Sequence, residues 1–182
     1  MGALRHIAEL DVSDVLARVP EFEKPSRHDY APPGLLHKSV FLRCHPEPDL
    51  TNWLQDLPVD DWPVLRGWAA MQELLGAARC AIAYDPVMGP LVDHNDLGRV
   101  ALSVIQPYGY IQWHVDLGEY AAAHLRFHIP LVTSPDCFVY AMGETRRLQT
   151  GHLTWLDTQV PHSAGNWGDR PRTHALFELR RA

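Results

Sequence analysis

A series of short β-rich segments in the second half of the chain most constrains the fold. Clusters of Gly, Pro, Asp and Asn separate these segments, as is typical of strands joined by turns. Short strands at this spacing favour an antiparallel sandwich or barrel. We therefore predict a mainly β fold with flanking helices, namely a double-stranded β-helix of the cupin-like jelly-roll type, with a site inside its open end. The expected strands are 100–106, 110–115, 124–132, 137–142, 152–156 and 172–179.

Residues 1–98 are expected to contain helices, short strands and loops, and to cover one face of the sheet. The clearest helix is expected at 63–79, where Pro63 suits the first turn and apolar residues recur at helical spacing. Further expectations are strands at 7–10 and 35–43, a helix that begins at Asp11 or Ser13 and ends near Val19, and loops at 25–34 and 85–98.

The length of 182 residues favours one domain, 1–182. Within it, residues 1–98 are expected to give support and the substrate side, and residues 99–182 the core with the metal site. The net charge of -6 comes from mixed acids and bases, which argues against nucleic-acid binding. Three separated cysteines argue against a disulfide framework or a thiolate zinc site. No segment is apolar enough to cross a membrane, so we expect a cytoplasmic protein without a membrane partner; its oligomeric state stays open.

Three side chains form a candidate metal-ligand set. His114 and Asp116 are two apart in an expected strand and therefore point to the same face, and His162 follows later in the chain. Two imidazoles and one carboxylate are the ligands of non-haem Fe(II) oxygenases, whereas a structural zinc site would favour thiolates. Such a metal keeps open positions for a 2-oxo acid and for O2. Arg172 could hold the distal carboxylate of a small dicarboxylate through two parallel hydrogen bonds.

The expected strand register adds neighbours to this set. If Tyr108 and Gly109 are the loop residues of a hairpin, Ser103 lies opposite His114. By the same alternation, Arg126 shares a face with His128, and Arg172 shares one with His174.

Two segments carry a family resemblance: His-Leu-Arg-Phe-His-Ile-Pro-Leu at 124–131 and His-Ser-Ala-Gly-Asn-Trp-Gly-Asp-Arg-Pro-Arg at 162–172. The stretch 103–172 resembles the aspartyl/asparaginyl β-hydroxylase family of Fe(II)/2-oxoglutarate oxygenases, which includes bacterial proline hydroxylases. The resemblance implies that the iron ligands are His114, Asp116 and His162, that Arg172 binds the distal carboxylate of 2-oxoglutarate, and that Ser103, Arg126 and His128 are further co-substrate contacts.

Asp116 also refines the expected chemistry. The animal enzymes of the family lack the carboxylate ligand, so the resemblance is closer to bacterial members that act on small molecules. A carboxylate at this position also disfavours halogenation, because halogenases of this general type leave it open for halide.

The resulting prediction is hydroxylation of an unactivated C–H bond with Fe(II), 2-oxoglutarate and O2, giving succinate and CO2. The expected substrate is an amino acid, an amino-acid-derived small molecule or a peptide side chain. Arg43 would pair with a carboxylated substrate. The candidate substrate contacts are Arg43, His37, Ser39, Trp155 and Asn166.

Two other functions use the same features. A cupin-like dioxygenase or isomerase that does not use 2-oxoglutarate would need the same β architecture and histidines, but would give Arg172 no role. A non-enzymatic β-sandwich binding module would leave the histidines incidental, and eleven histidines make chance motifs more frequent. Trp113 is expected to point away from the site, into a core.

Overall fold

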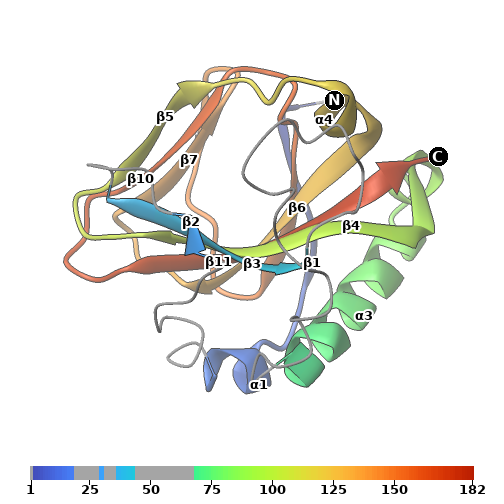
Figure 1. The fold of residues 1–182 in the computed structure, drawn as a ribbon, viewed down its shortest axis with the longest axis horizontal. Coiled ribbons are helices and arrows are strands. Elements are labelled where there is room, and N and C mark those ends of the chain that lie inside the picture. Colours follow the sequence, from blue (N-terminus) through green and yellow to red (C-terminus); the bar gives the residue numbers. More distant parts are fainter. Residues whose placement is uncertain (1, 19–28, 31–35, 44–67) are drawn as a thin grey trace.

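Two antiparallel sheets face each other in the computed structural model, which describes residues 2–18, 29–30, 36–43 and 68–182 (Figure 1). The larger sheet has the strand order β1-β9-β6-β11-β4-β3-β2, and the smaller has β5-β10-β7-β8. This arrangement confirms the predicted mainly β jelly-roll fold. The strands of the large sheet are β1 (Leu4–Glu9), β2 (Asp29–Tyr30), β3 (His37–Arg43), β4 (Val92–Ile105), β6 (His124–Val132), β9 (His152–Leu156) and β11 (Arg172–Arg181); those of the small sheet are β5 (Tyr110–His114), β7 (Cys137–Ala141), β8 (Glu144–Arg146) and β10 (His162–Asn166).

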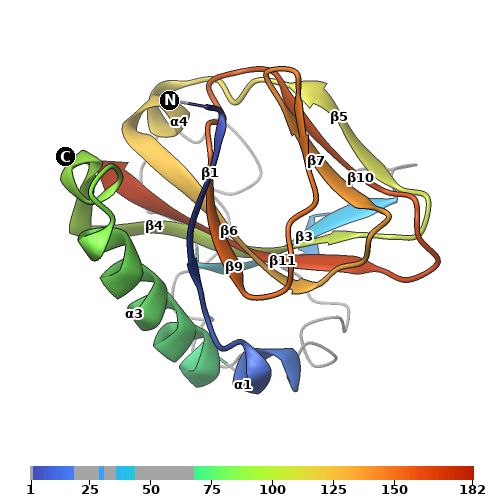
Figure 2. The same ribbon diagram turned by 180° about the vertical axis from the view of Figure 1, so that it is seen from behind.

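The helices α1 and α3 cover the face of the large sheet that points away from the small sheet (Figures 1 and 2). None of the described helices is long and apolar enough to cross a membrane. The helical elements are α1 (Ser13–Leu16), α3 (Trp68–Tyr84), the 3-10 turn η2 (Gly89–Leu91) and α4 (Glu119–Ala123).

The side chains of strand β11 point alternately into two interior regions, the helix-side core and the space between the sheets. Ala175 and Phe177 belong to the core between the large sheet and the helices, where they join Met71 and Phe127. Arg172, His174 and Glu178 alternate with them, so they point into the space between the two sheets. The apolar cluster between the sheets is correspondingly small: Ala3, Leu4, Ile105, Val139, Ala141, Leu156 and Ala164. Polar side chains therefore occupy part of the sandwich interior.

Several predicted boundaries are confirmed, and others are wrong. The strands expected at 124–132 and 152–156 match β6 and β9. The described helix α3 continues past Gly76 to Tyr84, because this glycine is exposed and the residues after it favour a helix. The loop expected at 85–98 is wrong in its second half, since β4 already begins at Val92 and pairs there with Arg181 of β11.

The hairpin expected at Tyr108 and Gly109 is also wrong. Strand β4 is hydrogen-bonded on both sides, to β11 and to β3, so it has no free edge for β5. The turn instead carries the chain from the large sheet to the small one, with Tyr108 at a positive φ of 60° (Figure 1). Ser103 consequently lies opposite His174 rather than His114.

Truncation of Phe177 tests the helix-side core. Its ring stacks on that of Phe127 with centroids 5.2 Å apart, and both side chains are fully buried. Phe177→Ala should lower the free energy of unfolding by about 3–5 kcal/mol through lost burial and a cavity. Urea denaturation checks this against Tyr84→Ala, an exposed control expected to stay within about 0.5 kcal/mol. Equal midpoints for both variants would contradict this description of the core.

Candidate functional site

His114, Asp116 and His162 lie together at the mouth of the sandwich. His162 on β10 is paired directly with His114 on β5, and their ring centroids are 4.1 Å apart. Asp116 follows β5, where its amide donates to the carbonyl of Thr158 at 3.0 Å. One donor atom from each of the three side chains lies within 4.8 Å of the others. The antiparallel pairing of β5 and β10 thus brings together ligands that are far apart in the sequence.

Backbone hydrogen bonds orient both imidazoles. His114 Nδ1 is 2.7 Å from the carbonyl oxygen of Gln112, and His162 Nδ1 is 2.9 Å from that of Val160. Because a carbonyl only accepts, each Nδ1 carries the proton and each Nε2 keeps a lone pair for a metal. Burial also lowers the pKa of His162, which favours its neutral, metal-binding form. The donor set therefore fits Fe(II) or a similar divalent transition metal.

An ion-pair network holds Asp116. Arg126 Nη1 lies 2.6 Å from Asp116 Oδ2, while Asp116 Oδ1 lies 3.5 Å from His114 Nε2. The same guanidinium donates to Glu178 Oε1 from Nη2 at 2.7 Å and from Nε at 3.1 Å. Arg126 thus fixes one oxygen of Asp116 and leaves the other facing the imidazole.

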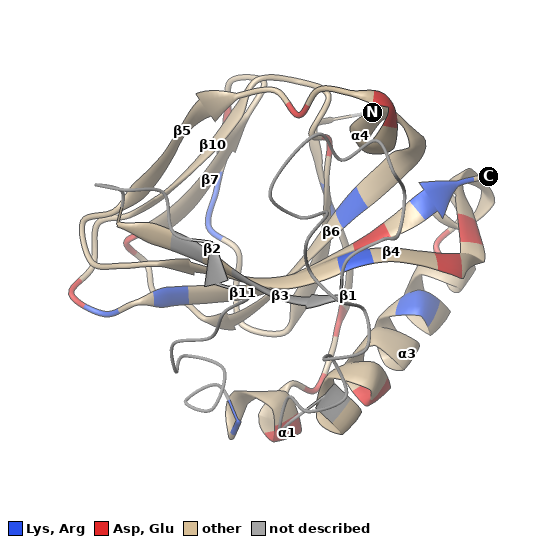
Figure 3. Cartoon of the chain, in the orientation of Figure 1, with Lys and Arg blue, Asp and Glu red and all other residues tan. Residues whose placement is uncertain are grey.

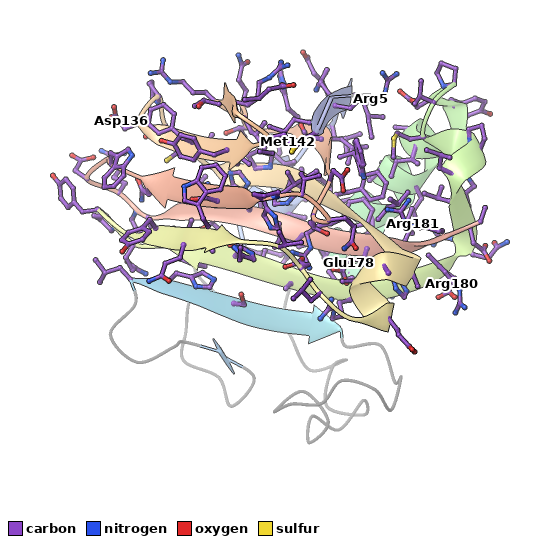
Figure 4. All side chains as sticks on the ribbon, turned by 90° about the horizontal axis from the view of Figure 1, so that it is seen from above. Arg5, Asp136, Met142, Glu178, Arg180 and Arg181 are labelled. Atoms are coloured by element: carbon purple, nitrogen blue, oxygen red, sulfur yellow. The ribbon has the colours of Figure 1, made fainter. Side chains whose placement is uncertain are left out.

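Glu178 is the centre of this network, because it pairs with both Arg99 and Arg126. Figure 3 shows acidic and basic segments side by side where β4, β11 and β6 are neighbours. Arg99 Nε donates to Glu178 Oε2 at 2.8 Å, and the Arg99 guanidinium lies 4.0 Å from the centre of the Tyr120 ring. Burial alone would raise the pKa of Glu178, but the charges of Arg126 and Arg99 outweigh it and lower that pKa to about 2. In Figure 4, Glu178 lies further inside than Arg180 and Arg181 at the end of β11.

Arg172 is a buried cation without a carboxylate partner among the described residues. Its side chain is fully buried, and its Nη2 donates to Nδ1 of His174 at 3.0 Å, while its Nε has no partner. Burial lowers the pKa of Arg172 to about 10, so it remains charged at neutral pH. An isolated buried charge is costly, and an anionic ligand would remove that cost.

A cavity of about 50 Å³ joins this cation to the histidines. One water needs about 10–15 Å³ by the same measure, so the cavity can hold a small ligand. Both ring nitrogens of His128 and Nε2 of His174 have no partner inside this region. Burial and the charge of Arg172 lower the pKa of both rings well below the usual range, which makes them neutral. The polar lining consists of Ser103, His114, Arg126, His128, His162, Ser163 and Arg172.

A second cavity of about 110 Å³ adjoins the first and shares Arg126 and Leu176 with it. Ser39 and Arg99 contribute its remaining polar side chains together with Glu178. It is a charged recess beside the candidate metal ligands.

The structure places the predicted metal and co-substrate residues around these cavities. Ser103 lies beside the first cavity because its strand, β4, pairs with β11 and β3, and not because of the predicted hairpin. The Arg126 guanidinium contacts Asp116 and Glu178, so it lies between the metal-ligand set and the second cavity.

The residues predicted for substrate binding divide into two groups. His37 on β3 lies opposite Ile105 of β4, and Ile105 in turn lies opposite Arg172 of β11. Burial lowers the pKa of His37, and the charges of Arg172 and His114 lower it further. Ser39 lines the second cavity. Arg43 belongs to β3, but its side chain lies outside the described residues.

Trp155 and Asn166 lie elsewhere. Trp155 is buried in the helix-side core, because it alternates with Thr154 and Leu156 on β9. Asn166 is fully buried, and its amide donates to the carbonyls of Ile105 at 3.0 Å and Arg170 at 2.7 Å. Neither side chain lines the two cavities beside the candidate metal ligands.

The prediction for Trp113 is half right. Its side chain points away from the site, but it is exposed beside Tyr140 on the outer face of the small sheet. No further layer of described residues covers that face, so no core forms there.

Sequence reasoning missed three polar residues of the site: Arg99, His174 and Glu178. The signal for two of them was present, since His174 and Glu178 lie two and six residues after Arg172 on one strand face. Arg99 had no assignable face, because the start of β4 was predicted as loop.

Comparison with known protein families identifies the family of this chain. The profile of the aspartyl/asparaginyl β-hydroxylase family matches residues 75–182, more than half of the chain. The chain belongs to this family. No curated protein sequence matches it significantly.

Three solved structures share the fold across nearly the whole chain. A 2OG-Fe(II) oxygenase-family oxidoreductase from Burkholderia pseudomallei has a TM-score of 0.61 at 14% identity, with 99% of this chain and 85% of that chain covered. The α-ketoglutarate-dependent epimerase SnoN of nogalamycin biosynthesis gives 0.63 at 15%, covering 98% and 78%. A Pseudomonas putida prolyl-4-hydroxylase gives 0.52 at 17%, covering 99% and 93%. These likenesses show a shared fold.

The neutral state of His174 predicts a pH dependence of stability. Its pKa is well below 6.5 when folded, whereas an unfolded histidine titrates near 6.5, so below about pH 6.5 the unfolded chain binds an extra proton. The free energy of unfolding should therefore fall as pH decreases, by about 1.4 kcal/mol per pH unit for this residue. His174→Asn should remove that part of the slope and leave the slope at pH 8 unchanged. Chemical denaturation across pH 5–8 measures it, and identical slopes for both proteins would contradict a neutral buried His174.

Proposed function

We propose that the chain is an Fe(II)/2-oxoglutarate-dependent hydroxylase that acts on a C–H bond of an amino acid, an amino-acid-derived small molecule or a peptide side chain. The observation that carries this proposal is the buried Arg172, which has no carboxylate partner among the described residues and lines the cavity that also contains the histidine donors. A dicarboxylate that reached from the metal to Arg172 would neutralise this cation. The membership of the family supports the same co-substrate.

In this proposal His114, Asp116 and His162 hold Fe(II), and Arg172 binds the distal carboxylate of 2-oxoglutarate. Ser103 and His128 contribute hydrogen bonds within the same cavity. His174 accepts from the Arg172 guanidinium and thereby fixes its orientation. When bound, Fe(II) and 2-oxoglutarate activate O2, and the net reaction gives hydroxylated product, succinate and CO2.

The cavity beside Arg126 is the proposed substrate side. Arg99, Arg126 and Glu178 place both signs of charge there within a small volume. This charged lining favours a zwitterionic or otherwise polar substrate, because a large apolar substrate would remove these polar groups from water without giving them new hydrogen bonds. Ser39 on β3 lines this cavity, and its hydroxyl lies 3.5 Å from Nε2 of His37. Both are proposed further contacts, with Arg43 on the same strand.

Replacing Arg172 tests the co-substrate site. Charged hydrogen bonds contribute about 1.5–3 kcal/mol, so Arg172→Gln should weaken 2-oxoglutarate binding about 10- to 150-fold. Calorimetric titration of the metal-loaded protein under anaerobic conditions measures the affinity. Arg170→Gln is the matched control, since Arg170 is exposed two residues away, and it should bind normally. Unchanged affinity in Arg172→Gln would favour a metal enzyme that does not use 2-oxoglutarate.

Replacing Glu178 tests the support of Asp116. Without the carboxylate of Glu178, Arg126 keeps only one of its two anionic partners. It should therefore compete more strongly with the metal for Asp116. Glu178→Gln should therefore weaken Fe(II) binding by about 10- to 100-fold, as for other changes behind a metal ligand. Competition with a fluorescent chelator measures this, with the exposed Glu144→Gln as control. Equal affinities in the two variants would show that the network does not orient Asp116.

The reaction itself is tested with a panel of amino acids and short peptides under oxygen, scored by succinate and by product mass. The proposal expects one member to give succinate with a mass increase of one oxygen. Succinate formed with a product of unchanged or lower mass would overturn hydroxylation and retain the co-substrate. Coupled product formation without any need for 2-oxoglutarate would overturn both.

A further inference from the structure

A second group of metal-binding side chains lies on the edge of the large sheet. His6 and Glu9 come from β1 and His152 from β9, and they share no residue with the site described above. We propose that these three side chains bind a divalent transition metal of the zinc class, which joins the edge strand to its neighbour. This inference does not depend on the proposed enzymatic function.

A β-bulge places the three side chains on one face. His6 and Glu9 are three residues apart, so in a regular strand they would point to opposite faces. The register between β1 and β9 shifts between His6 and Ala8, and this extra residue brings His6 and Glu9 to the same side. Glu9 lies directly opposite His152, and His6 lies opposite Thr154, two residues further along the same face of β9.

The donor geometry suits a metal. The rings of His6 and His152 have centroids 4.6 Å apart, and His152 Nε2 lies 3.4 Å from Glu9 Oε1. One donor atom from each side chain lies within 4.8 Å of the others. Small rotations of the exposed His6 and Glu9 side chains and of the half-buried His152 ring would bring all three onto one ion at the usual distances of about 2.0–2.2 Å.

The chemistry of the donors selects the class of ion. Two imidazole nitrogens and one carboxylate favour Zn²⁺, Ni²⁺ or Cu²⁺ over Mg²⁺ and Ca²⁺, which prefer oxygen ligands. The side chain of Glu9 is 77% exposed, so water can complete the coordination.

A metal ion bound at this position would stabilise the folded chain. Strand β1 is the outer strand of the seven-stranded sheet and has β9 as its neighbour (Figure 2). Leu4 of β1 belongs to the apolar cluster between the sheets. An ion that binds only when β1 is docked on β9 would stabilise the folded chain by mass action.

Titration calorimetry with Zn²⁺ on the full chain tests the proposal. The chain should bind two equivalents, one in the catalytic ligand set and one at the edge. His152→Asn and His6→Asn should each reduce the stoichiometry from two to one, whereas Glu119→Gln, an exposed carboxylate control on α4, should keep two.

A His114→Ala background separates the two sites. In it, Zn²⁺ should still raise the thermal midpoint, and adding His152→Asn should abolish that rise. Two outcomes would overturn the proposal: one equivalent in the unmodified chain that disappears with His114→Ala, or a thermal rise in His114→Ala that persists after His152→Asn. Mg²⁺ in place of Zn²⁺ should give no rise, and an equal rise would overturn the assigned class of ion.

Discussion

The buried charge of Arg172 is the constraint on which the rest of the interior depends. Arg172 has no carboxylate partner among the described residues. Its charge can be buried between the sheets only where polar neighbours surround it and an anionic ligand can bind it. His174 and the neutral His128 supply part of that environment. The space between the sheets therefore cannot close into an apolar core, and most of the hydrophobic burial lies instead between the large sheet and α3.

The strands that form the helix-side core also position the residues of the site. Phe177 and Glu178 are neighbours on β11, one in the helix-side core and the other in the network that holds Arg126 and Asp116. Hydrogen bonds from the histidine rings to backbone carbonyls fix the imidazoles on the opposite sheet. The two candidate histidine ligands are thus positioned on strands, while Asp116 directly follows β5 and is held by Arg126. Support of this kind favours a preorganised metal site.

Much of this could be predicted from the sequence, because it depends on local alternation. The strands β6 and β9 and the shared face of Arg126 and His128 follow from a period of two along a strand. His114 and Asp116 do lie together, but β5 ends at His114, so strand alternation is not what places Asp116 there. Sheet pairing is non-local, and this is where prediction failed. Nothing near Tyr108 reveals that β4 is already paired on both sides, so the hairpin to β5 and the position of Ser103 opposite His114 were wrong. The start of β4 at Val92 similarly depends on the length of β11, far along the chain.

Visible absorption of the protein, titrated anaerobically with Fe(II) and 2-oxoglutarate, tests most directly whether a metal and a dicarboxylate bind together in this cavity. A charge-transfer band should appear only when both are present and should be absent when succinate, which lacks the keto group, replaces 2-oxoglutarate. Saturating both components without any such band would contradict a cavity in which a metal and a dicarboxylate bind together beside Arg172.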